Sequence, residues 1–465
     1  MHKIMHYTSY KDPSGFVFMH NNDIYRQVNH LYKKHYDKLL NSNLYTTLVN
    51  QGLLVSHVEC QEFNSDSITK DKYKIIKPEK LEYITYPYEW CFSQLKDAAL
   101  CTLTIQKIAL EHSMTLKDAN AYNIQFRNGK PIFIDTLSFE EYEKGSPWIA
   151  YFQFCKHFLA PLALMAYKDI SLNQLLKTNI DGIPLDLCCK LLPFKAKLNG
   201  GIFMHLVLHN KFNKQNETNS NINIKNQKIS KIQLEALIDS LYSTISALKF
   251  PKIKTEWGKY YTNTNYTQTS QKQKFEIVEN YINQIVDSNK NISKGCDFGA
   301  NDGTFSRLLS KNNISTIALD IDAQAVEKNY LQMKENREPR ILPLIQDLIN
   351  PSPAIGFMNK ERDDINARFK CDIGMALALI HHLAISNNLP FENIAEFFSN
   401  LCHYLIIEFV PKTDSKVKIL LATREDIFEN YSETNFELQF SKYFNIEQKQ
   451  HLYQSDRILY LLKRK

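Results

Sequence analysis

Residues 296–305 read Cys-Asp-Phe-Gly-Ala-Asn-Asp-Gly-Thr-Phe, and this stretch decides how the chain folds. The apolar run at 292–298 predicts a strand, and the residues after it predict a tight turn into a helix at 303–311. The whole chain has only 13 glycines in 465 residues, whereas glycine usually makes up about 7% of a protein. Three of them fall within residues 295–303. This turn therefore needs small side chains in a way that the rest of the chain does not.

Carboxylates follow the next two predicted strands. Residues 314–320 end in Asp320, and residues 341–345 are followed by Asp347. The carboxyl ends of parallel strands meet at one edge of a sheet, where the start of a helix offers free N–H groups to a ligand. Asp320 is placed to accept hydrogen bonds from both hydroxyls of a ribose, and Asp347 is placed to accept a hydrogen bond from the amino group of an adenine. The pattern predicts a site for an adenosine compound.

The spacing of the turn indicates which adenosine compound. A dinucleotide site requires Gly-x-Gly-x-x-Gly, but Asn301 and Thr304 stand where the second and third glycines belong, so NAD is disfavoured. The run resembles the Gly-x-Gly-x-Gly turn of class I S-adenosylmethionine-dependent methyltransferases, with Asn301 at the middle glycine. This resemblance covers residues 256–465 and implies S-adenosylmethionine as the cofactor. The alternative is a nucleotide-shaped turn that serves packing alone.

The resemblance also implies a role for individual residues. Asp297 would lie near the methionine ammonium, and Asp320 would hold the ribose. The other implied cofactor-binding residues are Gly299, Asn301 and Gly303 in the turn, and Asp347 and Leu348 beside the adenine.

Three further residues are candidates for catalysis. His381 and His382 follow the fourth predicted strand, 371–379, where the methyl acceptor binds in this superfamily. Each is either a general base or a hydrogen-bonded loop histidine. Glu408, at the end of the strand 405–410, either orients the acceptor or cofactor or is a buried structural carboxylate. A base is needed only when the methylated atom carries a proton, because positioning supplies much of the acceleration in an in-line displacement.

The pattern from residue 292 onward alternates apolar strands with helical periods. This predicts a parallel sheet covered on both faces. Two final runs, 444–448 and 458–462, are close enough to form a hairpin. We predict a doubly wound, Rossmann-like α/β methyltransferase sheet that ends in an antiparallel hairpin.

A second nucleotide-like pattern lies near the N-terminus. Asp118 and Asn123 are five positions apart, and Asp135 ends a strand twelve residues further on. This resembles the catalytic loop and metal-binding strand of kinase-like and aminoglycoside-phosphotransferase-like folds. The resemblance implies that Asp118 accepts the substrate proton while Asn123 and Asp135 hold the magnesium of Mg-ATP. Leu116 replaces the usual histidine, however, and Arg26 stands where a strand lysine is expected.

These departures predict a degenerate, kinase-like α+β domain over residues 1–212, with one amphipathic helix within residues 32–54. The domain transfers phosphate, binds a nucleotide or acceptor, or serves as a scaffold. The remaining boundaries are a polar linker at 213–229, a helical connector at 230–291 and the methyltransferase domain at 292–465.

Composition and residue spacing argue against a nucleic-acid-binding protein, a membrane-spanning protein and a metal-binding protein. The net charge of +6, from 56 basic and 50 acidic residues, is too small to indicate a nucleic-acid partner. The strongest apolar stretch, 158–167, is about half of the ~20 residues that a membrane helix needs, so we expect a cytoplasmic protein without a membrane span. Nine cysteines include no Cys-x-x-Cys pair, and His205 and His209 lack a third ligand, so no metal site is predicted. The sequence does not set the oligomeric state.

Over its whole length the chain resembles class I methyltransferases of the NoeA-like nodulation protein family. The stretches that carry this resemblance are 86–96, 113–123, 380–383 and 408–412. It implies methyl transfer to an oxygen or nitrogen of a small-molecule or glycan acceptor that the sequence does not identify. Two alternatives stay open: a kinase-like phosphotransferase whose C-terminal domain senses S-adenosylmethionine, and a non-catalytic adaptor.

Overall fold

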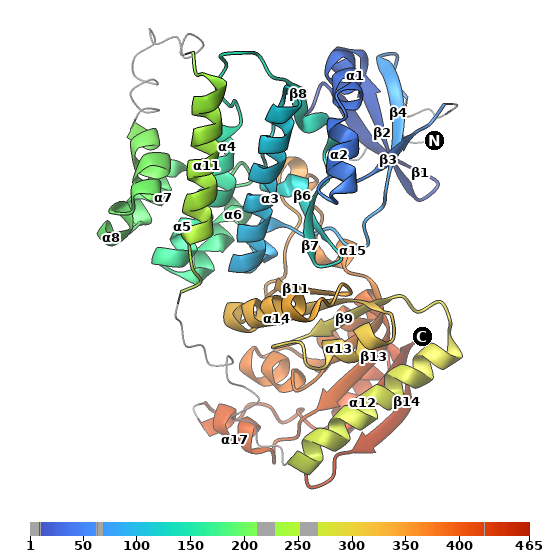
Figure 1. The fold of residues 1–465 in the computed structure, drawn as a ribbon. Helices are drawn as coiled ribbons and strands as arrows, with labels where there is room; N and C mark the ends of the chain where they lie inside the picture. The colour runs from blue at the N-terminus through green and yellow to red at the C-terminus, as the bar shows by residue number, and fades with distance from the viewer. Residues whose placement is uncertain are drawn as a thin grey trace. The chain divides into compact units, whose positions relative to one another are not determined.

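The structure is a computed structural model that describes residues 9, 11–61, 63, 68–211, 228–251, 268–422 and 424–465. The chain forms two compact units, drawn in Figure 1. The first comprises Met1–Lys252 with Ala354–Asp363, and the second comprises Ile253–Pro353 with Asp364–Lys465. The chain therefore leaves the second unit once and returns to it ten residues later.

The first unit begins with an antiparallel sheet of four strands in the order β1-β2-β4-β3. These strands are β1 (Gly15–His20), β2 (Asp23–Asn29), β3 (His57–Glu59) and β4 (Lys72–Pro78). Asn21 and Asn22 join β1 to β2 with φ values of 49° and 65°, and a two-residue type I′ turn requires positive φ at both positions. Helix α1 (Lys33–Asn41) buries Tyr36 against Val28 and Ile76 of the sheet.

Short hairpins and helices complete this α+β unit. The hairpin strands are β5 (Met114–Leu116) with β8 (Phe139–Glu141), and β6 (Ile124–Arg127) with β7 (Lys130–Phe133). The helices are α2 (Leu44–Asn50), α3 (Phe92–Glu111), α4 (Tyr151–Phe154), α5 (Ala160–Tyr167), α6 (Leu175–Thr178), α7 (Leu185–Leu191), α8 (Phe194–Lys197), α9 (Gly200–Ile202) and α11 (Lys231–Ala247). Single-turn and π-helical segments are η2 (His30–Tyr32), η3 (Pro87–Glu89), η4 (Ala121–Asn123), η5 (Thr136–Ser138), η6 (Cys155–Leu159), η7 (Ile170–Gln174), η8 (Phe203–Leu208) and η11 (Phe357–Asn359).

The second unit is built on a seven-stranded sheet in the order β11-β10-β9-β12-β13-β15-β14. The strands are β9 (Lys294–Phe298), β10 (Ser315–Asp320), β11 (Ile341–Ile345), β12 (Cys371–Ala376), β13 (Cys402–Phe409), β14 (Phe444–His451) and β15 (Ile458–Arg464). The first five are parallel, whereas β15 runs antiparallel to both β13 and β14. The predicted Rossmann-like sheet with a terminal antiparallel hairpin is confirmed.

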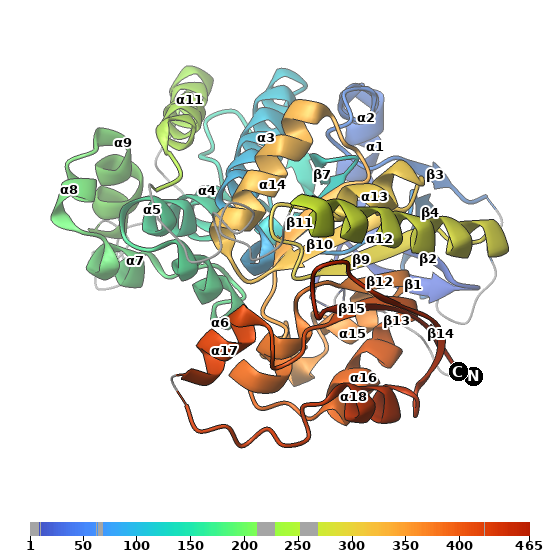
Figure 2. The same ribbon diagram turned by 90° about the horizontal axis from the view of Figure 1, so that it is seen from below.

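Helices cover both faces of this sheet. Figure 2 shows α12, α13 and α14 on one side and α16 and α18 on the other. The helices of this unit are α12 (Gln268–Ser288), α13 (Ser306–Lys311), α14 (Ala323–Asn336), α15 (Ile365–Arg368), η12 (His382–Ser386), α16 (Phe391–Leu401), α17 (Ser415–Ala422) and α18 (Glu433–Phe440). Tyr281 and Ile282 of α12 pack with Leu308 of α13 onto Ile373 and Ile406 of the strands. This burial on both faces explains why the strands read as continuous apolar runs.

The division of the chain differs from the predicted boundaries. The ammonium of Lys96 on α3 donates to the carbonyl oxygens of Ser246 and Leu248 at 2.7 and 2.8 Å, which fixes the end of α11 to the first unit. The predicted connector 230–291 therefore contributes one helix to each unit. The predicted linker 213–229 lies outside the described residues except for its last two. No helix in the described ranges carries an apolar run long enough to cross a bilayer.

Candidate functional site

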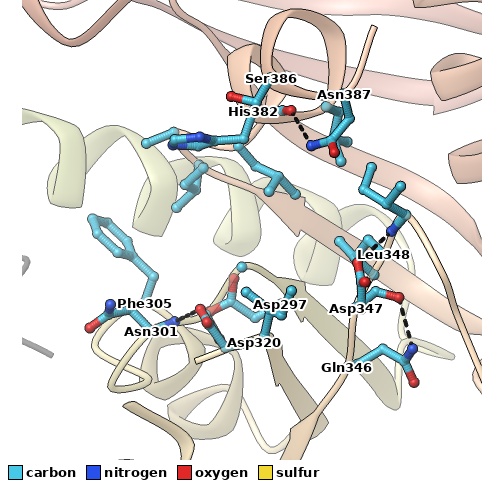
Figure 3. Close-up of a pocket in the computed structure, with 18 of the residues that line it drawn as sticks. Asp297, Asn301, Phe305, Asp320, Gln346, Asp347, Leu348, His382, Ser386 and Asn387 are labelled. Carbon is cyan, nitrogen blue, oxygen red and sulfur yellow. Dashed lines mark hydrogen bonds between the residues drawn. The ribbon is translucent and has the colours of Figure 1, made fainter. Parts of the chain in front are cut away.

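A cavity of about 270 Å³ lies in the second unit at the carboxyl ends of its parallel strands (Figure 3). In chain order the strands β9, β10 and β11 extend the sheet in one direction, and β12 and β13 extend it in the other. The sheet thus reverses its winding between β9 and β12, and open α/β sheets bind ligands at such a switch point. The topology alone places a crevice here.

The turn after β9 forms one wall of the cavity. The backbone N–H groups of Gly299 and Ala300 both donate to the carbonyl oxygen of Leu319 at 2.9 Å, which ties the turn to β10. Gly303 has a φ of 76°, and a Cβ there would lie 2.4 Å from the side chain of Asn329, so only glycine fits. Asn301 has a φ of 50°, and asparagine tolerates this left-handed region better than most residues.

Two carboxylates lie next to each other on this wall, the buried Asp297 and the partly buried Asp320 (Figure 3). Asp297 accepts a hydrogen bond of 2.7 Å from the hydroxyl of Ser306, and burial raises the pKa of its carboxyl to about 7. Asp320 accepts the N–H groups of Asn301 and Asp322 at 2.7 and 2.8 Å. Burial raises its pKa to about 6, although these two hydrogen bonds oppose the shift. The wall favours a positively charged ligand, which would lower both pKa values.

The segment after β11 forms a second wall. Asp347 and Leu348 both line the cavity. The carboxylate of Asp347 accepts the N–H of Ile349 at 2.9 Å, while its backbone carbonyl accepts the side-chain amide of Gln346 at 3.0 Å. The hydroxyl of Ser352 in turn donates to Gln346 at 3.0 Å. These bonds fix the turn, so that it presents a carboxylate and an apolar side chain together.

The π-helical segment η12, with His382 and Ser386, and the following residue Asn387 provide the wall opposite the two carboxylates (Figure 3). Burial lowers the pKa of His382 to about 4, so its imidazole is neutral at pH 7. The neighbouring His381 is only 3% exposed and does not line the cavity, although the two rings lie 4.1 Å apart. His382 is therefore the histidine that a ligand in this cavity can reach.

Glu408 lies one layer behind the cavity wall. Its side chain is fully buried, and its Oε2 accepts hydrogen bonds from Lys274 Nζ and from the backbone N–H of Ala378, both at 2.7 Å. Ala378 lines the cavity in the left-handed region, at a φ of 51°. Because this conformation is unfavourable for alanine, the hydrogen bond that Ala378 donates to Glu408 stabilises the shape of the wall.

The second predicted constellation comes together in the first unit. Burial and the nearby charge of Asp135 raise the pKa of Asp118, and the amide of Asn123 donates to Ser138 at 3.3 Å. Arg26 forms an ion pair with Asp135. An adjacent polar cavity of about 310 Å³ is lined by Lys117, Asn120, Gln153, Lys156, His157 and Asp181, among others.

Comparison with known proteins decides the family. No protein-family profile matches the chain. Nodulation protein NoeA of Rhizobium meliloti (strain 1021) is 33% identical over 461 residues, which cover 98% of this chain and 95% of that protein. The chain belongs to the NoeA nodulation protein family.

Solved structures resemble parts of this NoeA family member only weakly. The bifunctional kinase-methyltransferase WbdD is 12% identical, with a TM-score of 0.31 over 41% of this chain and 39% of that chain. Magnesium protoporphyrin IX methyltransferase (ChlM) from Synechocystis PCC 6803 with bound SAH is 17% identical, with a TM-score of 0.32 over 45% of this chain and 92% of that chain. The fold assignment rests on the strand order of the sheet.

Most of the residues predicted for the cofactor site of this NoeA family member line one cavity: Asp297, Gly299, Asn301, Asp320, Asp347 and Leu348, with His382 opposite. Gly303 shapes the turn behind the wall, and His381 and Glu408 stand behind it. Sequence reasoning missed Lys274, Phe305 and Ser386, which also line the cavity.

A signal for one of these missed residues was present. Lys274 lies three and four positions before Ile277 and Val278, on the apolar stripe of α12. A charged residue on a buried stripe is informative because lysine is almost never buried without a partner.

The raised pKa of Asp297 predicts a specific pH dependence of stability. Its pKa in the folded protein lies above the ordinary value of 3.8, so its stabilising contribution is complete below pH 4 and is lost as the pH rises through 7. Asp297→Asn keeps an acceptor for Ser306 and removes the ionisation. We expect the variant to gain roughly 2–4 kcal/mol relative to the wild type between pH 4 and pH 7. Denaturant unfolding measured at both pH values checks this, and a constant difference would contradict it.

Proposed function

We propose that the second unit binds S-adenosylmethionine and that the protein transfers its methyl group to an oxygen or nitrogen of an acceptor. The observation that supports this proposal most strongly is the pair of adjacent carboxylates, the buried Asp297 and the partly buried Asp320, on the wall of a cavity at the switch point of the sheet. S-adenosylmethionine carries a sulfonium and an ammonium group, so its charge complements this wall.

The residues of the cavity fit this cofactor position by position. The carboxylate of Asp320 would accept the ribose hydroxyls, and Asp297 would face the ammonium. Asp347 and Leu348 would receive the adenine, the first as a hydrogen-bond acceptor and the second as an apolar surface. Gly299 leaves the backbone of the turn open to close approach.

S-adenosylmethionine supplies an electrophilic methyl group when it is bound. The chain contributes position and proton transfer. Leu377, Ala378 and Leu379 line the cavity with an apolar surface that would help to position the reacting groups and would limit access of water. His382 is neutral at pH 7 and can accept the proton that an attacking hydroxyl or amine loses. Glu408 and His381 support this wall without reaching the cavity.

The acceptor we propose is a small molecule or glycan with a free hydroxyl or amine. The test is methyl transfer from an isotopically labelled donor to metabolite extracts, read by untargeted mass spectrometry. A labelled product that forms with wild-type protein and disappears with His382→Ala and Asp320→Ala supports the proposal. No labelled product with any extract, despite donor binding, would refute the transferase activity.

Donor affinity should depend on pH. Binding of a cation favours the ionised forms of Asp297 and Asp320, whose pKa values are about 7 and about 6 without ligand. Protons must therefore leave on binding at low pH, and we expect affinity for S-adenosylmethionine to rise from pH 5 to pH 7.5. Calorimetry in buffers of different ionisation enthalpy measures both affinity and proton release. Affinity that does not change over this range would contradict the assigned contacts.

A second candidate function is phosphate transfer by the first unit, with Mg-ATP as cofactor and the second unit as a sensor of S-adenosylmethionine. It is favoured by one observation: Asp118, Asn123 and Asp135 come together beside a polar cavity. The ion pair between Arg26 and Asp135 weakens the case, because it occupies a carboxylate that would hold magnesium.

Substitution of Asp118 separates these functions. If the first unit transfers phosphate, Asp118→Ala should abolish ATP turnover, because a catalytic base typically contributes a factor of about 10²–10⁴. Asp169→Ala, which removes an exposed helix cap in the same unit, is the matched control and should leave turnover unchanged. Turnover that is insensitive to Asp118→Ala, or absent from the wild type, would dismiss this candidate.

A further inference from the structure

Lys274 is the single lysine or arginine among the described residues that line the cavity of the second unit. It lies on α12 and is only 4% exposed. Its ammonium group stands 5.0 Å from the centroid of the Phe305 ring, which also lines the cavity. A lysine in this position places one positive charge on a wall that is otherwise rich in carboxylates.

The charge of Lys274 is maintained by a buried network. Its ammonium pairs with Glu408 at 2.7 Å, and Arg457 lies 3.6 Å from the other oxygen of Glu408. Arg457 also pairs with Asp414 at 2.7 Å. Burial lowers the pKa of Lys274, but the charge of Glu408 opposes this shift. The positive charges of Lys274 and Arg457 balance the negative charges of Glu408 and Asp414. Glu408 therefore keeps Arg457 as a positive partner when Lys274 interacts with a ligand.

Lys274 and Asp297 are also close enough for each to influence the other's ionisation. The amino-acid end of S-adenosylmethionine carries an ammonium and a carboxylate on one carbon atom. A carboxylate and a lysine on neighbouring parts of one wall match such a zwitterion, because each can pair with the opposite charge.

We infer that Lys274 binds the carboxylate of the donor's amino-acid end, beside the ammonium that faces Asp297. This inference rests on the proposed function. It makes Lys274 a specificity-determining residue that favours ligands with an intact amino-acid group over adenosine thioethers that lack the carboxylate.

The test compares S-adenosylhomocysteine with its decarboxylated counterpart, S-adenosyl-3-thiopropylamine, by calorimetry. Wild-type protein should bind the first about 10- to 100-fold more tightly, the value expected for a hydrogen bond to a charged group. Lys274→Met combined with Glu408→Gln removes both charges and keeps an acceptor for the N–H of Ala378. This double variant should bind the two ligands with nearly equal affinity, whereas Lys274→Arg should retain much of the preference.

Each outcome separates the inference from the proposed function. Selectivity that persists in the double variant, or an equal loss of affinity for both ligands, would overturn the role of Lys274 and leave the cofactor site in place. Wild-type protein that binds neither ligand would overturn both. Thermal unfolding of the double variant, compared with the wild type, verifies that it is folded when these affinities are measured.

Discussion

Replacing Asp320 with alanine is expected to weaken binding of S-adenosylmethionine at least about 100-fold. Two hydrogen bonds from ribose hydroxyls to a charged carboxylate contribute roughly 1.5–3 kcal/mol each, and both are lost in this variant. The substitution also removes the acceptor for the N–H groups of Asn301 and Asp322. The two hydrogen bonds that are lost hold the turn in place. Calorimetry with the wild type and the variant measures the effect.

Asp372→Ala is the matched control for this experiment. Asp372 also accepts two backbone N–H groups, from Ser293 and Lys294 at 2.8 and 2.9 Å, but it does not line the cavity. Donor affinity should be nearly unchanged in this control. Equal affinity of the wild type and Asp320→Ala would show that the ribose does not lie against β10.

Gly303→Ala is expected to destabilise the second unit by about 2–4 kcal/mol and to reduce donor binding in parallel. A left-handed φ costs roughly 1–2 kcal/mol for a residue with a Cβ, and forcing an extra carbon into a packed site costs about 1–3 kcal/mol more. Here that carbon would meet the side chain of Asn329 at 2.4 Å. Hydrogen exchange of β9 and α13, measured together with donor affinity, reports both effects.

Gly200→Ala provides the comparison, because a Cβ at Gly200 meets nothing within 4 Å and the residue lies at the start of a helix. This variant should be as stable as the wild type or slightly more stable. If Gly303→Ala were equally harmless, the turn would not have the rigid geometry that we assign to it.

Much of the second unit could be predicted because its signals are local. Each apolar run forms a strand, and a carboxylate directly after a strand must lie at the carboxyl edge of a parallel sheet. This pattern predicted that Asp320 and Asp347 lie at one edge of the sheet, and both line the cavity, whereas Asp297, inside β9, was implied only by the methyltransferase resemblance. The final hairpin followed in the same way from two strand-like runs with a short connection.

The sequence could not predict which of two neighbouring residues faces the cavity. His381 and His382 are adjacent, and the sequence offers both as candidates for the base. Which ring faces the cavity depends on the π-helical winding of η12, which is set by packing rather than by a local pattern. Likewise, the helix predicted within residues 32–54 is two helices, because Asn43 adopts a left-handed φ of 63° between them.

Contacts that connect distant parts of the chain also escaped prediction. Lys274 and Glu408 are 134 residues apart, and their pairing depends on how α12 lies against β13. The excursion of residues 354–363 into the first unit depends on contacts such as the hydrogen bond from the N–H of Asp363 to the hydroxyl of Tyr86 at 2.7 Å. No periodicity within either segment encodes these partners.

The most direct test of the central claim is a crystal structure of the protein with S-adenosylhomocysteine. The account predicts ligand density at the carboxyl ends of β9 and β10, with both ribose hydroxyls within hydrogen-bonding distance of Asp320 and the adenine against Leu348. Crystals grown at a saturating ligand concentration that show no density in this cavity, or density elsewhere in the chain, would contradict it.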